Sequence, residues 1–271
     1  MKLFVDGPAG RHEAYAYTGG KAFDAGLPTI VFVHGALNDH SVWTLLARWF
    51  AHHGHGVLAV DLPGHGRTAG PALTSVEAMA DWLLALLDAA GVATASLVGH
   101  SMGSLVALHV AAQAPARARD LVMIGTACPM AVSPALLEMA EHDPQRAMAS
   151  VNAWSHSTPS SKPSHPGPGA WLHGGNLALM QRCQAAEPGT NLFLTDFRAC
   201  DAYRVGLEAA ARVTCPRVLI AGRRDQMTPP KAAAALAAAL SAPVVEIDAG
   251  HAVMTQAPDA VLAALRRAVL R

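Results

Sequence analysis

Ser101 lies at the centre of the pentapeptide Gly99-His100-Ser101-Met102-Gly103, which has the pattern G-x-S-x-G. The glycines two residues before and two residues after Ser101 permit a tight turn that leaves the serine hydroxyl projecting from the backbone. A serine hydroxyl attacks a carbonyl carbon only when a neutral base accepts its proton and an acid orients that base. The pattern therefore predicts nucleophilic catalysis by Ser101, provided that such a pair lies nearby.

Two residues fit the base and the acid, because each directly follows a strand-like apolar run. His251 follows Val244–Ile247, and Asp225 follows Val218–Ile220. The carboxyl ends of parallel strands gather at one edge of a sheet, where open α/β folds bind their ligands. We therefore predict a site of Ser101, Asp225 and His251, in that chain order.

Other acids and histidines have structural interpretations. Asp196 and Asp201 lie away from predicted strand ends, and Asp248 precedes the last predicted loop, so none is preferred to Asp225 as the acid. His100 is expected to support the turn rather than to contact substrate, and His34 is expected to brace its own loop by hydrogen bonding.

Alternating strands and helices must position these residues. Apolar, β-branched runs ending in turn residues predict strands at Thr29–Val33, Val57–Val60, Ser96–Gly99, Leu121–Ile124, Val218–Ile220 and Val244–Ile247. Apolar residues at helical spacing predict helices over Ser41–His53, from Ser75 to near Gly91, after Ser101 to Gln113, over Lys231–Leu240 and from Pro258 onward. Two weaker segments, Lys2–Asp6 and His12–Thr18, predict an antiparallel hairpin at the edge. This order predicts a doubly wound α/β fold with a mostly parallel sheet.

The alternation stops after the sixth predicted strand. Residues 128–212 contain helical stretches at Leu136–Ser150 and Asn176–Ala186, separated by the Pro-, Ser- and Gly-rich segment Ser157–Gly169. We predict a core of residues 1–127 and 213–271, with 128–212 inserted as a helical cap that carries a mobile loop. Four residues could line an acyl pocket under the cap or pack the cap on itself: Trp154, Trp171, Met180 and Phe197.

The composition of the chain bears on its location and on the classes of partner that it can bind. Twenty basic residues balance twenty acidic ones, so no positive field favours nucleic acid. No apolar segment approaches the ~20 residues that span a bilayer, and no secretory signal is recognisable near the amino terminus. Four cysteines without C-x-x-C spacing are expected to be reduced thiols, and the histidine cluster at residues 52–55 lacks the converging acidic or thiol ligands of a metal site. These features predict a cytoplasmic protein with a small-molecule substrate and neither a nucleic-acid nor a membrane partner.

Together these motifs resemble the α/β-hydrolase superfamily over nearly the whole chain. Val33-His34-Gly35-Ala36 looks like its oxyanion loop, and Asp61-Leu62-Pro63-Gly64-His65-Gly66 like its loop after the following strand. The resemblance implies Ser101 as nucleophile, His251 as base and Asp225 as acid, with the backbone N–H groups of Ala36 and Met102 forming the oxyanion hole and no metal or organic cofactor. Ser104 departs from the common pattern, which often has a third glycine there.

The function expected from this resemblance is hydrolysis of an ester or a related acyl bond, such as a lactone or thioester, through an acyl-enzyme. A carbon–carbon bond hydrolase is less favoured, because the loop Gly35-Ala36-Leu37-Asn38 is less glycine-rich and His100 replaces the usual Asn before the serine. A cofactor-free perhydrolase and a non-catalytic small-molecule receptor stay open. The natural substrate and the oligomeric state are left open by the sequence.

Overall fold

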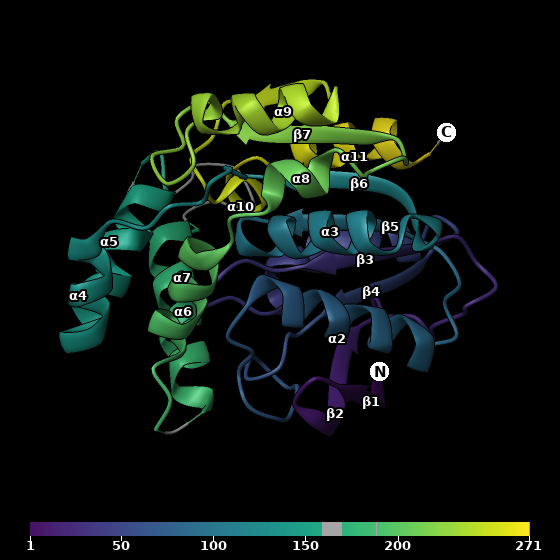
Figure 1. The fold of residues 1–271 in the computed structure, drawn as a ribbon, viewed down its shortest axis with the longest axis horizontal. Helices are drawn as coiled ribbons and strands as arrows, with labels where there is room; N and C mark the ends of the chain where they lie inside the picture. Colours follow the sequence, from purple (N-terminus) through teal and green to yellow (C-terminus); the bar gives the residue numbers. More distant parts are fainter. Residues whose placement is uncertain (159–169, 188, 271) are drawn as a thin grey trace.

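A single eight-stranded sheet organises the molecule (Figure 1). The structure, a computed structural model, describes residues 1–158, 170–187 and 189–270. The strands lie in the order β1-β2-β4-β3-β5-β6-β7-β8. They are β1 (Lys2–Gly7), β2 (Gly10–Tyr17), β3 (Thr29–Val33), β4 (Gly56–Val60), β5 (Ala95–His100), β6 (Ala118–Ile124), β7 (Arg217–Gly222) and β8 (Val244–Ile247). Strands β3 to β8 pair in parallel. Strands β1 and β2 form the predicted antiparallel hairpin, and β2 also pairs antiparallel with β4.

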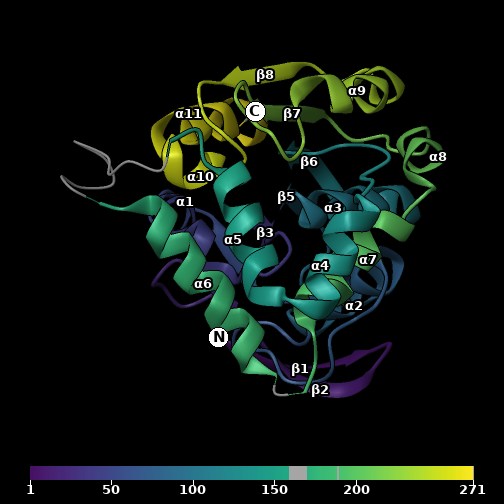
Figure 2. The same ribbon diagram turned by 90° about the vertical axis from the view of Figure 1, so that its left-hand side faces the viewer.

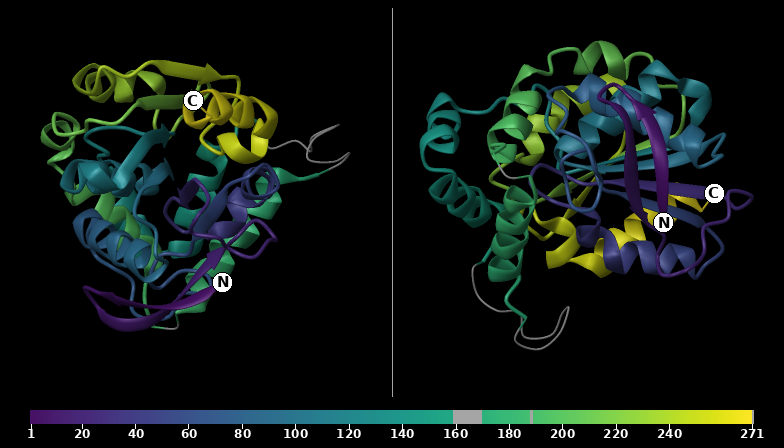
Figure 3. Two further views of the ribbon diagram at one scale, coloured as in Figure 1. Left: turned by 90° about the vertical axis from the view of Figure 1, so that its right-hand side faces the viewer. Right: turned by 90° about the horizontal axis from the view of Figure 1, so that it is seen from below.

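The central strands are buried on both faces, which explains their continuous apolar sequence. In β3, Val31 and Val33 pack in one hydrophobic cluster, while Ile30 and Phe32 pack in another on the opposite face. Helices lie on both faces of the sheet, as the two views of Figure 3 show. The helices on the first face are α2 (Val76–Ala89), α3 (Met102–Gln113) and α9 (Ala234–Leu240), and those on the second are α1 (Thr44–Ala51) and α11 (Pro258–Val269). The predicted doubly wound α/β fold is confirmed.

The helices differ from the predicted ones mainly at their ends. The helix predicted over Ser41–His53 begins as a 3-10 turn, His40–Trp43, before α1, and a 3-10 turn, Pro230–Ala233, likewise precedes α9. A short helix, α10 (Val253–Gln256), follows His251 and was not predicted. Helix α2 begins after Ser75, near the predicted start, and the Ser75 side chain caps it by accepting a hydrogen bond from the Ala78 N–H.

The described residues between β6 and β7 form five helices, and four of them cover the carboxyl end of the sheet (Figure 2). They are α4 (Pro134–His142), α5 (Pro144–Ser155), α6 (Leu172–Ala186), α7 (Leu192–Ala202) and α8 (Gly206–Ala210). Helices α4 to α7 share a hydrophobic cluster, here called the cap cluster, whereas α8 packs on α3 and α9. The division at residues 128 and 212 stays a prediction, and most of the expected mobile loop, residues 159–169, lies outside the described residues.

Two further features concern the cysteines and the length of the apolar helices. Cys128, Cys183, Cys200 and Cys215 are buried free thiols, and burial raises the pKa of each. Within the described part of the chain, no helix combines the length and the apolar character needed to cross a bilayer.

Candidate active site

Ser101 occupies the turn between β5 and α3. Its backbone adopts φ 51° and ψ −122°. Residues other than glycine rarely adopt this conformation, which costs about 1–3 kcal/mol. The Ser101 N–H donates to Ile124 O at 2.9 Å, which ties the turn to β6. A β-carbon at Gly99 would meet the backbone of Gly103, and one at Gly103 would meet the Val33 carbonyl. Both glycines are therefore needed for strand and helix to approach each other.

His251 and Asp225 lie together beyond the ends of β8 and β7. His251 Nδ1 is 2.8 Å from Asp225 Oδ2. Asp225 Oδ1 accepts the Met227 and Thr228 N–H groups at 2.7 and 2.9 Å, and the Thr228 hydroxyl donates to Oδ2 at 2.8 Å. Burial alone would raise the pKa of Asp225, but His251 and the bonds from Thr228 outweigh it and lower the pKa to about 2. Asp225 is therefore ionised at neutral pH and can orient the imidazole ring.

His100 supports this arrangement from the other side of the turn. Its Nε2 lies 3.0 Å from the carbonyl oxygen of His251, and the two imidazole rings are 4.7 Å apart. Burial, followed by the nearby His251, lowers the pKa of His100 to about 3, so its ring is neutral and Nε2 carries the proton that faces the carbonyl. His100 thus fixes the backbone of His251, as the structural interpretation expected, although it also lines the cavity described below.

The loop after β3 is braced by His34. Its Nδ1–H donates to Gly35 O at 2.8 Å, and its Nε2 accepts the Leu62 N–H at 3.1 Å. Burial lowers the pKa of His34 to about 4, which keeps the ring neutral and able to serve both bonds. Among the residues that the structure describes, neither the Ala36 N–H nor the Met102 N–H donates to a protein acceptor. These are the two groups predicted to form an oxyanion hole, and Ala36 lines the cavity described below.

A cavity of about 290 Å³ opens over Ser101. His251, His100 and Ala36 line it from the sheet side, and Trp154, Met180 and Phe197 line it from helices α5, α6 and α7. Trp171, the fourth predicted pocket residue, is mostly exposed and lies outside this cavity. The described lining residues include no Lys, Arg, Asp or Glu, so none of these four residue types offers a charged partner in the cavity.

The three acids that the sequence analysis set aside lie away from His251. Asp248 pairs with Arg224 on the surface, and Asp201 accepts the Val132 N–H within the inserted segment. Asp196 is fully buried on α7, where its Oδ2 accepts the Leu37 N–H and bonds His65 Nε2, each at 2.9 Å. Sequence reasoning missed these contacts, because nothing local marks a pair 159 positions apart. It also missed Thr228, although an Asp side chain that accepts the N–H two residues on, as Asp225 does from Met227, is a common local turn pattern.

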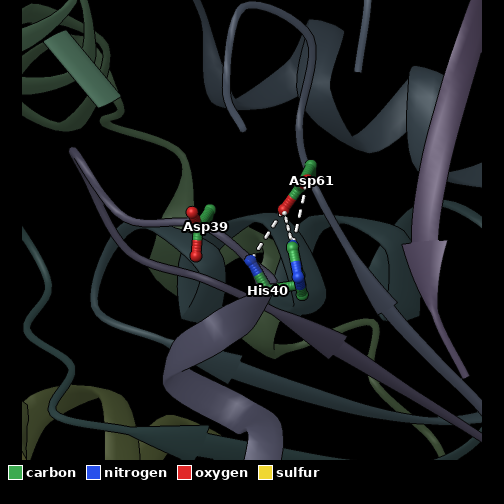
Figure 4. Close-up of side chains that lie close together, drawn as sticks. All are labelled: Asp39, His40 and Asp61. Carbon is green, nitrogen blue, oxygen red and sulfur yellow. Dashed lines mark hydrogen bonds and ion pairs between the residues drawn. The ribbon is translucent and has the colours of Figure 1, made fainter. Parts of the chain in front are cut away.

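One group of side chains within the described ranges has a spacing that could hold a metal ion: Asp39, His40 and Asp61 (Figure 4). Their oxygens are already hydrogen-bonded. Asp61 accepts the His40 N–H and imidazole at 2.7 and 2.8 Å and the Arg67 N–H at 2.9 Å, while Asp39 accepts the Ser41 N–H and pairs with Arg182. An ion would have to displace a backbone donor and a cation, so the group is better explained as a brace between two loops.

The structure accounts for Ser104, the residue at which the sequence departs from the common family pattern. The Ser104 hydroxyl, buried in the first turn of α3, bonds Ser101 O at 2.6 Å and lies 2.8 Å from Thr126 Oγ1. The buried Ser104 hydroxyl therefore has hydrogen-bond partners, and its presence in place of a glycine leaves no buried polar group unpaired.

Comparison with known proteins places the chain in a family. The model of the alpha/beta hydrolase family matches residues 30–264, so the chain belongs to that family. It is 32% identical over 147 residues to the lipase LipV of Mycobacterium tuberculosis, a match that covers 50% of this chain and 54% of the lipase. The matches to curated relatives cover 28% to 54% of those proteins' length.

Solved structures share the fold over the full chain. An esterase from Exiguobacterium antarcticum superposes with a TM-score of 0.83 at 15% identity, covering all of both chains. The enol-lactonase from Burkholderia xenovorans superposes with a TM-score of 0.78 at 20% identity, covering 99% of this chain and all of the lactonase. At these identities the likeness concerns the fold.

Proposed function

We propose that the protein is a serine hydrolase that cleaves an ester, or a related acyl bond such as a lactone or thioester, through an acyl-enzyme. The observation that carries the proposal is the placement of Ser101 on a strained turn, in one cavity with His251, whose Nδ1 is held 2.8 Å from the ionised Asp225. Family membership and the lipase and esterase relatives support the same class of reaction.

In this mechanism Ser101 Oγ attacks the carbonyl carbon while His251 Nε2 takes the hydroxyl proton. Asp225 stabilises the imidazolium that forms, and the Ala36 and Met102 N–H groups donate to the oxygen that becomes negative. His251 then gives its proton to the departing alcohol or thiol, which leaves the acyl group on Ser101. A water molecule, deprotonated by His251, attacks that acyl group and releases the acid and the free serine.

The cavity indicates what the substrate must look like. A buried carboxylate or ammonium is costly without a counter-charge, and the described lining offers none. A volume of about 290 Å³ is near the lower end of the range for small-molecule sites. We therefore infer an uncharged acyl group of small to medium size, which disfavours the carbon–carbon hydrolase alternative for substrates that bear a carboxylate.

A fluorophosphonate probe tests the nucleophile without knowledge of the substrate. Intact-mass spectrometry of the native protein should show one adduct, and peptide mapping should place it on Ser101. Ser101→Ala should give no adduct and no turnover of p-nitrophenyl esters, because the attacking oxygen is removed. Ser150→Ala, a half-buried serine on α5, is the matched control and should label like the native protein.

Labelling at another serine, or ester turnover retained by a clean preparation of Ser101→Ala, would overturn the proposal. A folded, monodisperse native protein that forms no adduct and cleaves no ester across a series from acetate to octanoate would favour the receptor alternative.

A further inference from the structure

The loop that follows β3 is joined to the cap at Leu37. The Leu37 N–H donates to Asp196 Oδ2 of α7 at 2.9 Å, and both residues are fully buried. Leu37 directly follows Ala36, whose N–H belongs to the proposed oxyanion hole. The hydrogen bond therefore acts one peptide away from a group that would stabilise the transition state.

The Leu37 side chain makes a second connection. In the cap cluster, every buried member lies between residues 136 and 197 except Leu37, which inserts from the core and packs among residues such as Leu136 and Phe193. Leu37 also has φ 51°, a left-handed conformation that is strained for a branched side chain. Such a conformation persists where its surroundings impose it, and here the surroundings are the Asp196 carboxylate and the apolar side chains of the cap.

Asp196 also binds the second loop of the site. His65 Nε2 lies 2.9 Å from the same Asp196 Oδ2, and His65 Nδ1 lies 3.1 Å from Pro63 O. Both ring nitrogens face oxygen acceptors, an arrangement that favours the doubly protonated ring. Burial alone would lower the pKa of His65, but the charge of Asp196 and its hydrogen bond raise it. The imidazole rings of His65 and His34 are 4.9 Å apart, which connects the ion pair to the histidine that braces Gly35.

We propose that Asp196 is a positioning residue that holds the Ala36–Leu37 peptide in its catalytic conformation, so that the oxyanion hole is complete only while α7 is docked on the core. The inference rests on the proposed function, because it assigns Asp196 a role in serine catalysis. Asp196 touches neither substrate nor nucleophile. Its effect is transmitted through the Leu37 N–H and through His65.

The test compares Asp196→Ala and Asp196→Asn with Asp201→Asn, a matched control on the same helix whose carboxylate accepts the Val132 N–H inside the inserted segment. Steady-state kinetics with a p-nitrophenyl ester give kcat and KM. Affinity for an alkyl trifluoromethyl ketone, which forms a tetrahedral adduct with the serine, reports the oxyanion hole. Amide hydrogen exchange at Leu37 reports the hydrogen bond without requiring activity.

Loss of one oxyanion-hole donor typically lowers kcat by about 10²- to 10³-fold, so a misplaced donor in Asp196→Ala should lower kcat by roughly 10- to 100-fold. KM should change by less than about threefold, since the ground state binds through the cavity walls, and ketone affinity should fall by the same factor as kcat. Leu37 amide exchange should accelerate. Asp196→Asn keeps one amide oxygen for Leu37, so it should fold if the alanine variant does not and should show the same pattern with a smaller loss.

A folded Asp196 variant with native kcat and native ketone affinity, or with unchanged Leu37 exchange, would overturn the inference. A rise in KM at constant kcat would also contradict it, because it would indicate a role in substrate binding alone. Failure of the proposed function has a different signature, in which the native protein shows neither ester turnover nor a fluorophosphonate adduct. In that case, accelerated Leu37 exchange in the variants would show that Asp196 holds the Leu37 N–H, but the catalytic role of Asp196 would be refuted.

Discussion

Ser101 combines a nucleophilic side chain with a backbone conformation that the surrounding elements impose. The cost of φ 51° is offset by the Ser101 N–H bond to Ile124 and by the close contact of β5 and α3. Helix α3 begins directly after this turn, and a helix amino terminus favours negative charge. At the residue scale, the local strain and the proposed oxyanion stabilisation therefore have one origin.

The acid of the site allows a sharp prediction at this scale. In Asp225→Asn, the two N–H donors at Oδ1 will select the amide oxygen, which leaves the amide NH₂ facing His251 Nδ1. Nδ1 must then act as an acceptor, and Nε2 carries the proton that it should take from Ser101. We expect kcat for ester hydrolysis to fall by roughly 10⁴-fold with little change in melting temperature.

The matched control is Asp248→Asn, whose carboxylate pairs with Arg224 at the surface. It should keep kcat within a factor of about two, as exposed ion pairs contribute little. A comparable loss of kcat in both variants would argue that the acid of the site is misassigned.

At the scale of elements, β3, β5 and α3 depend on close backbone approach at two glycines. A β-carbon at Gly103 would meet the Val33 and His34 carbonyls, and backbone atoms cannot move aside as a side chain can. Gly103→Ala should therefore lower the free energy of unfolding by about 3 kcal/mol or more, since it forces α3 away from the sheet. Urea denaturation measures this quantity directly.

Gly175→Ala provides the contrast, because a β-carbon there meets no atom within 4 Å on helix α6. Alanine is favoured over glycine in a helix by about 1 kcal/mol, so this variant should be as stable as the native protein or more stable. Equal destabilisation by both substitutions would contradict the packing argument.

The elements that the sequence predicts well are those whose signals are local. The strands beside the site have continuous apolar runs, and Ser75 and Pro258 mark helix starts that the structure reproduces. Helix α10 has no side-chain cap, whereas α7 begins at Asn191, whose side chain accepts the Leu194 N–H, a local signal that sequence reasoning did not use. The Asp196 contacts with Leu37 and His65 depend on tertiary structure alone, so no pattern along the chain could reveal them.

At the scale of the whole molecule, two neutral buried histidines make stability depend on pH. Burial lowers the pKa of His34 to about 4 and that of His100 to about 3, below the ordinary value of 6.5. Between pH 6.5 and these values the unfolded chain binds protons that the folded protein does not, so unfolding is favoured as the pH falls. Each histidine contributes a slope of about 1.4 kcal/mol per pH unit in this window.

Urea unfolding at a series of pH values from 7 to 4.5 should show the free energy of unfolding falling steadily. In His100→Gln the slope of the unfolding free energy against pH should decrease by about 1.4 kcal/mol per pH unit, the contribution of one histidine. The glutamine side chain can donate to His251 O but does not titrate. The exposed His52→Gln is the control and should keep the native slope. A free energy of unfolding that does not change between pH 6.5 and 5 would show that these rings are protonated in the folded state.

The four buried cysteines have a practical consequence for observing the molecule. Thiol-directed dyes react with accessible thiolates, and burial both shields these sulfur atoms and raises their pKa. A cysteine introduced on the outer surface of α6 and a second on α1 would therefore be the sites that a maleimide fluorophore pair modifies first. Energy transfer between the two dyes would then follow the separation of cap and core in single molecules, with the native cysteines left in place.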